Sequence, residues 1–287
     1  MQKKKTVSLV LGSGGARGYA HIGVIKELEK QGYEIKSISG SSMGALVGGL
    51  YASGKLQAYE DWVLNFDALD ILKLVDFSFS DGGMIKADKV FDKIEEFIGE
   101  DILIEDLPIP FTATATDILN KKEVWLKKGS LKDAIRASIA IPTIFTPKKL
   151  NGRVLFDGGI LNPVPILPVT SEFTDLVIAV NLNDDAIIKD KHKKIFQEDD
   201  SYFKKTIGKF LNKKFTNTKK KKLSYFEILN LSIESMQDVI ARHQLASHKP
   251  DIMINVSSKA CEFYDFHKAK ELIEYGRCIT KDVLKDY

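Results

Sequence analysis

The pattern G-x-S-x-G places one serine where it could act as a nucleophile. Residues 40–44 read GSSMG and centre this pattern on Ser42, with Gly40 and Gly44 on its two sides. The apolar residues before it predict a strand and the small residues after it predict a helix. A sharp turn between them would lift the serine oxygen away from the backbone, toward the positive end of the helix. The pattern therefore predicts acyl transfer through Ser42.

A glycine-rich loop near the N-terminus could bind the negative oxygen that acyl transfer creates. Residues 12–18 read GSGGARG and join a predicted strand to a predicted helix. Backbone N–H groups at such a junction bind anions, and each well-placed donor contributes roughly 10²–10³ in rate. The loop does not match a nucleotide-binding motif, because Arg17 stands where the last glycine of G-x-G-x-x-G belongs. Arg17 could shape the loop, meet an anionic substrate or be a plain surface residue.

Two Asp-Gly-Gly triplets offer a carboxylate that could take the serine proton. Asp157 follows the predicted strand 154–156, whereas Asp81 lies in a predicted connecting loop. Carboxyl ends of parallel strands meet at one edge of a sheet, so Asp157 should lie on the same edge as Ser42. We therefore favour Asp157 over Asp81 as the base.

None of the five histidines is expected to be the base. His21 lies within reach of the glycine-rich loop, His192 should be exposed in a lysine-rich segment, and His243 should pack on the apolar face of a helix. His248 is interpreted as a helix cap, and His267 lies in a charged helical stretch. The expected catalytic unit is a serine–aspartate dyad.

Strands and helices are expected to alternate along the chain. The strands are predicted at residues 6–11, 35–39, 111–116, 123–126, 154–156 and 176–180. The helices are predicted at residues 17–31, 43–53, 56–66, 86–98, 130–139 and 225–247. This alternation predicts an α/β fold with a mainly parallel sheet that is covered on both faces.

Composition narrows the class of protein. The chain has 287 residues, 44% of them apolar, and a net charge of only +3, which gives no argument for nucleic-acid binding. Its two cysteines, Cys261 and Cys278, are interpreted as reduced structural thiols. No apolar stretch is long enough for a signal peptide core or a membrane span, so we expect a cytoplasmic protein that could be peripheral to a membrane.

Taken together, the three motifs resemble the patatin-like phospholipase family, especially its bacterial members. Two further blocks support the resemblance: residues 137–142 (ASIAIP), before Asp157, and residues 162–165 (NPVP), after it. The resemblance covers residues 6–182 and, more weakly, 223–256. It implies a three-layer α/β/α sandwich that hydrolyses acyl ester bonds of lipids, with no metal and no organic cofactor.

The resemblance also implies a role for each motif residue. Ser42 would be the nucleophile, flanked by Gly40 and Gly44 of the elbow, and Asp157 would be the base. The backbone N–H groups of Gly14, Gly15 and Ala16 would form the oxyanion hole, and Arg17 would support that loop. The family often has three consecutive glycines in this loop, where the present chain begins with Ser13.

The chain is divided into a catalytic core at 6–182, a lysine-rich insertion at 183–222 and a helical part at 223–287 that completes the same domain. Residues 189–222 contain thirteen lysines and four acidic residues. Residues 202–215 (YFKKTIGKFLNKKF) could form an amphipathic helix that docks on anionic lipid. The alternative is a solvated loop.

The sequence thus predicts a serine hydrolase of the phospholipase A or lysophospholipase type, with a lipid acyl ester as substrate. Two alternative activities would use the same residues: acyl transfer to an acceptor other than water, and cleavage of thioesters. A non-catalytic, membrane-associated regulatory protein is the alternative from another class. The head group, the acyl chain length and the oligomeric state are not predicted.

Overall fold

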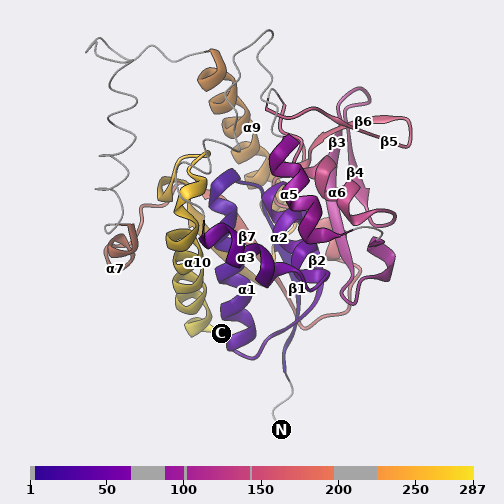
Figure 1. Ribbon diagram of the computed structural model, residues 1–287. Coiled ribbons are helices and arrows are strands. Elements are labelled where there is room, and N and C mark those ends of the chain that lie inside the picture. The colour runs from indigo at the N-terminus through magenta and orange to yellow at the C-terminus, as the bar shows by residue number, and fades with distance from the viewer. Residues whose placement is uncertain (1–3, 66–87, 100–101, 143, 197–224) are drawn as a thin grey trace, which may run out of the picture.

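The buried run Thr6–Leu11 forms β1 at the centre of the sheet. It pairs in parallel with β2 (Glu34–Ser41) on one side and with β7 (Leu176–Asp184) on the other. β3 (Phe111–Asp117) and β8 (Ile252–Ser257) extend the parallel sheet outward from these two strands. The computed structural model describes residues 4–65, 88–99, 102–142, 144–196 and 225–287, and Figure 1 shows their arrangement.

The sheet becomes antiparallel on the far side of β2. β3 pairs antiparallel with β4 (Lys122–Leu126) and with β6 (Arg153–Asp157), and β6 pairs antiparallel with β5 (Lys148–Leu150). The eight strands run in the order β5-β6-β3-β2-β1-β7-β8, with β4 attached to β3. The prediction of an α/β fold with a mainly parallel sheet is confirmed.

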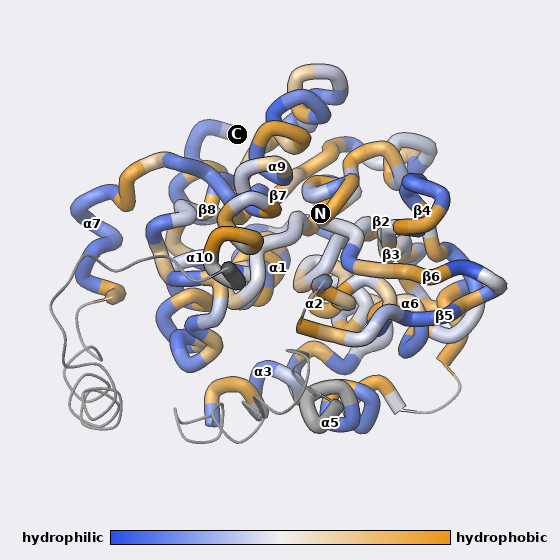
Figure 2. Tube along the Cα trace, turned by 90° about the horizontal axis from the view of Figure 1, so that it is seen from above, coloured by the Kyte–Doolittle hydropathy of each residue, from blue (hydrophilic) through white to orange (hydrophobic). Residues whose placement is uncertain are grey.

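Alternate residues of β1 point to opposite faces of the sheet, and each face has its own core. Leu9 and Leu11 belong to the larger core, and four of the helices that contribute to this core cover the sheet face. These helices are α1 (Ala20–Lys30), α2 (Met43–Ala52), α6 (Leu131–Ser138) and α10 (Ala269–Val283). α3 (Leu56–Leu64) and α5 (Asp88–Ile98) lie beside each other outside this layer (Figure 2), where the rings of Trp62 and Phe97 meet.

The smaller core covers the opposite face. Val10 and Ala179 of the sheet pack there with Val164, Ile166 and residues of α9 (Tyr225–Ser247). Helices on one face and α9 on the other make the three-layer α/β/α sandwich that was predicted.

The C-terminal part, which was expected to be helical, also contains a strand. Residues 252–257 form β8, which pairs with β7 and so belongs to the same sheet as the N-terminal strands. The first helix also begins differently, because residues 15–19 form a 3-10 turn before α1. Of the lysine-rich segment, the structure describes a short helix α7 (Asp190–Lys193) and the turn after it. Residues 202–215 and Asp81 lie outside the described residues.

No helix in the described ranges is long and apolar enough to cross a membrane.

Candidate active site

Ser42 occupies a strained turn between β2 and α2. Its φ of 54° and ψ of −124° lie in a region that residues other than glycine seldom adopt. The turn is buried, with Ser42 only 3% exposed, and its N–H donates a 3.0 Å hydrogen bond to Oγ of Ser138 on α6. Strain of this kind persists where the surrounding structure holds it, as in a nucleophile elbow.

Gly40 and Gly44 allow the strand and the helix to meet at this turn. A Cβ on Gly44 would overlap the carbonyl oxygen of Leu11 on β1, and a Cβ on Gly40 would overlap the carbonyl group of Gly44. Backbone atoms cannot move aside as a flexible side chain can. The spacing of the two glycines therefore follows from the close approach of β1, β2 and α2.

Asp157 lies directly beside Ser42. The serine Oγ donates a 2.6 Å hydrogen bond to Oδ2 of Asp157, and the Gly159 N–H donates a 2.7 Å bond to the other carboxylate oxygen. Burial raises the pKa of Asp157 from 3.8 to about 7, because water no longer stabilises its charge; the bonds from Ser42 and Gly159 offset part of this rise. A carboxyl group with this pKa can both accept and return a proton near neutral pH.

The strand that carries Asp157 runs in the direction opposite to the one predicted. β6 runs antiparallel to β3, so Asp157 does not share an edge with Ser42 as the end of a parallel strand. Instead β4 takes one side of β3, while β2 and β6 follow each other along the other side. Ser41 pairs with Thr114 and Asp157 pairs with the next residue, Ala115. The carboxyl ends of β2 and β6 thus meet head-on, which brings the two side chains together.

The glycine-rich loop meets the same pocket through Ser13 and Gly14. Gly15 has a φ of +55°, and a Cβ there would collide with Phe263. No hydrogen bond within the described part of the chain uses the N–H of Gly14 or Gly15. Ala16 departs from the expectation for the oxyanion hole, because its N–H donates a 2.9 Å bond to the carbonyl oxygen of Phe263.

Arg17 is buried and joins the loop to several distant segments. Its guanidinium donates to Oδ1 of Asn183 at 2.9 Å, to Oε1 of Glu234 at 3.2 Å and to the Cys261 carbonyl at 3.3 Å. A plain surface arginine is therefore excluded, and the contacts are those of a side chain that holds the loop. Neither Asn183 nor Glu234 stood out in the sequence, because their relation to the loop depends on the tertiary fold.

The histidines lie away from the serine–aspartate pair, but two of them differ from expectation. Nε2 of His21 donates a 2.8 Å hydrogen bond to the Gly12 carbonyl oxygen, and burial lowers the pKa of His21 to about 4. His192 is 6% exposed rather than solvated, since it packs on Tyr275 and lies 3.0 Å from Asp282. His243 is exposed rather than packed.

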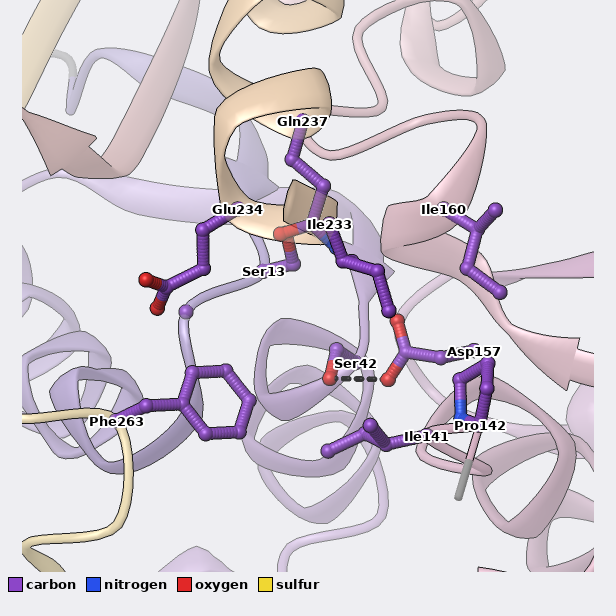
Figure 3. Close-up of a pocket in the computed structure, with 11 residues that line it drawn as sticks. Ser13, Ser42, Ile141, Pro142, Asp157, Ile160, Ile233, Glu234, Gln237 and Phe263 are labelled. Atoms are coloured by element: carbon purple, nitrogen blue, oxygen red, sulfur yellow. Dashed lines mark hydrogen bonds between the residues drawn. The ribbon is translucent and has the colours of Figure 1, made fainter. Parts of the chain in front are cut away.

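A mostly apolar pocket opens above the pair. Figure 3 shows Ser42 and Asp157 side by side in this pocket, with Ile233 of α9 reaching toward them, while Gln237 lies near Ser13 and the carboxylate of Glu234 points to the side. The remaining side chains of the wall are Ile141, Pro142, Ile160 and Phe263. The spacing of Leu229, Ile233, Met236 and Ile240 predicts one apolar face on this helix, but Leu229 and Met236 are exposed. Within the described ranges, no three side chains of His, Cys, Asp or Glu gather as a metal site.

The chain is similar to known proteins of one family. Residues 9–170 match the family model described as patatin-like phospholipase. This chain belongs to the patatin-like phospholipase family. It is 35% identical to an uncharacterized NTE family protein of Mycobacterium tuberculosis (strain ATCC 25618 / H37Rv), over 98% of this chain and 92% of that protein.

Other relatives share a smaller part of their length with this chain. The patatin-like phospholipase domain-containing protein 6 of Mus musculus is 33% identical over 62% of this chain, which is 13% of that protein. The crystal structure of VipD from Legionella pneumophila aligns with 99% of this chain and 67% of its own, at 16% identity and a TM-score of 0.49. Membership of the family places the chain among lipid hydrolases.

Proposed function

We propose that this protein hydrolyses acyl ester bonds of lipids, as a phospholipase A or lysophospholipase, through the dyad of Ser42 and Asp157. The 2.6 Å hydrogen bond between the serine oxygen and a buried carboxylate is the observation that carries the proposal. Both side chains are 3% exposed, and they lie at the base of a pocket whose wall is largely apolar. An acyl chain would find apolar contacts there.

The acylation step follows from the positions of these groups. Oγ of Ser42 attacks the ester carbonyl carbon while its proton passes to Oδ2 of Asp157. The carbonyl oxygen becomes negative and is bound by the N–H groups of Gly14 and Gly15. Asp157 then returns the proton to the leaving alcohol oxygen as the carbon–oxygen bond breaks, which leaves an acyl-serine.

Deacylation repeats the sequence with water as nucleophile. Asp157 takes a proton from water, the hydroxide attacks the acyl-serine, and Ser42 recovers its proton as the fatty acid leaves. The Gly159 N–H, 2.7 Å from Oδ1, keeps the carboxylate oriented throughout both half-reactions. Arg17 supports the oxyanion loop from behind rather than contacting substrate.

The experiment is fatty acid release from matched dispersions of lysophosphatidylcholine, phosphatidylcholine and diacylglycerol, with an acyl thioester in parallel. Wild type should release fatty acid from at least one oxygen ester, and Ser42→Ala should release none above background. Release from the thioester alone would favour a thioesterase. Transfer to added glycerol or lysolipid with little free acid would favour an acyltransferase, and inactivity on all substrates would favour the regulatory alternative.

Membrane contact is a separate part of the proposal. The lysine-rich sequence of residues 202–215, with apolar residues at helical spacing, would hold a cytoplasmic enzyme at an anionic lipid surface. Sedimentation with anionic vesicles should recover wild type and lose a variant lacking residues 196–222. Equal recovery of both proteins would rule out docking through this segment, without bearing on the chemistry of Ser42.

A further inference from the structure

Asn183 joins the glycine-rich loop to Arg17 through both ends of its side-chain amide. Its Oδ1 accepts a hydrogen bond from Arg17 at 2.9 Å, and its Nδ2 donates one to the carbonyl oxygen of Ser13 at 3.1 Å. Its own backbone N–H donates to Oδ1 of Asn181 at 3.1 Å. The side-chain amide is thus held at both ends and the backbone at a third point near the end of β7, and the donor end of the amide is directed at the loop.

The bond to Ser13 determines how the next N–H group points. A trans peptide unit is planar, so the Ser13 carbonyl and the Gly14 N–H point to opposite sides of the chain. When Asn183 holds the carbonyl, the N–H is turned away from Asn183. Gly14 lines the pocket together with Ser42, so this N–H is available to a ligand of the serine.

The Ser13–Gly14 peptide needs such an external hydrogen bond more than the two peptides before it do. Glycine tolerates a wide range of backbone angles, so rotation of this peptide would meet little steric resistance at Gly14. The two preceding amides are already engaged, with Gly12 N–H bonded to the Val180 carbonyl at 3.0 Å and Ser13 N–H bonded to the Pro163 carbonyl at 2.8 Å. Rotation would replace the Gly14 N–H by a carbonyl oxygen, which repels an oxyanion.

We infer that Asn183 is a positioning residue of the oxyanion hole, which it serves by fixing the orientation of the Ser13–Gly14 peptide. This inference rests on the proposed hydrolysis at Ser42. Arg17 fixes which way the Asn183 amide faces. Its hydrogen bond to Oδ1 holds the oxygen end, so the Nδ2 end faces the glycine-rich loop. Asn183 touches neither the substrate nor the reacting atoms.

Two substitutions separate the two ends of the amide. Asn183→Asp keeps an acceptor for Arg17 and removes the donor to Ser13, whereas Asn183→Leu removes both with the same branching at Cγ and adds no charge. Asn255→Asp is the matched control, since Asn255 is exposed on β8. Each protein is assayed on p-nitrophenyl butyrate, and inhibition is measured with an alkyl trifluoromethyl ketone that forms a tetrahedral adduct with serine.

Both Asn183 variants should lower kcat roughly tenfold or more, with KM nearly unchanged, because the lost stabilisation belongs to the transition state. Affinity for the ketone should fall by a similar factor, while the pH midpoint of the rate stays in place because Asp157 is untouched. The control should match wild type in every respect.

Wild-type kcat in the Asn183→Asp variant, or lower kcat with unchanged ketone affinity, would overturn the inference. If Asn183→Leu does not fold, Asn183→Asp alone decides. An inactive wild type that also fails to bind the ketone would instead overturn the proposed function, and the inference with it.

Discussion

The two members of the dyad are built by different kinds of structure. Ser42 stands on a local turn between consecutive elements, β2 and α2, and its glycines meet backbone atoms only a few residues away or on the neighbouring strand. Asp157 is brought in by β6, which follows β2 along one side of β3 from the opposite direction. A nucleophile elbow can therefore be recognised from five residues, whereas the position of the base depends on the pairing of three strands.

The largest effect is expected from removing either partner. Ser42→Ala and Asp157→Asn should each lower kcat for ester hydrolysis by at least about 10³-fold, because each removes a group needed in both half-reactions. Asp106→Asn, at an exposed position, is the matched control and should keep wild-type rates. Steady-state rates on one soluble ester suffice. Substantial turnover by Asp157→Asn would mean that Asp157, which β6 places beside Ser42, is not the base.

The elbow can be broken through its packing. Gly44→Ala should destabilise the fold by about 3 kcal/mol or more, since the new Cβ overlaps the carbonyl oxygen of Leu11. Gly54→Ala is the comparison: its φ is +71° with open space around it, so only the backbone penalty of about 1 kcal/mol applies. The free energy of unfolding of both variants is measured by urea denaturation. Equal losses would show that close packing at residue 44 is unimportant.

The base can be examined through pH. Because burial raises the pKa of Asp157 to about 7, the carboxylate needed to accept the serine proton is lost as pH falls below that value. The kcat/KM of wild type should rise about tenfold per pH unit below pH 7 and level off above it. A profile that stays flat down to pH 5 would indicate an unshifted carboxyl group or another base.

Parts of the molecule follow from short stretches of sequence. The predicted strand 6–11 matches β1, which ends before Gly12, and the predicted helix 225–247 matches the described α9, because apolar patterns are local properties. The pairing of strands is not local, so the antiparallel direction of β6 was missed although Asp157 was the residue chosen. The side chains that α9 and Phe263 add to the pocket were missed for the same reason.

Hydrogen bonding explains the remaining errors. Ala16 was expected to bind the oxyanion because it follows two glycines, but its N–H is taken by the carbonyl of Phe263, nearly 250 residues further along the chain. His192 was expected to be exposed because lysines surround it in the sequence, yet Asp282 and Tyr275 on the C-terminal helix bury it. Sequence neighbours do not reveal such partners.

The smallest effect on activity is expected from removing the hydrogen bond between Ser138 of α6 and the elbow at Ser42. Ser138→Ala removes the acceptor for the Ser42 N–H and leaves that buried donor unpaired, so stability should fall by about 1–3 kcal/mol and activity by a few fold. Ser235→Ala removes a hydroxyl that bonds only its own helix on the surface, and should change stability by less than about 0.5 kcal/mol. The melting temperatures of both variants are measured by thermal unfolding and compared with that of the wild type. Indistinguishable melting temperatures would mean that Ser138 does not support the elbow.

The most direct test of the dyad is the intact mass of the protein after treatment with a fluorophosphonate. Wild type should gain one adduct, Ser42→Ala should gain none, and Asp157→Asn should react much more slowly at the same serine. This pattern would establish a serine activated by the neighbouring carboxylate. An adduct that persists in Ser42→Ala, or folded wild type that gains none, would contradict the assignment of Ser42 as the nucleophile.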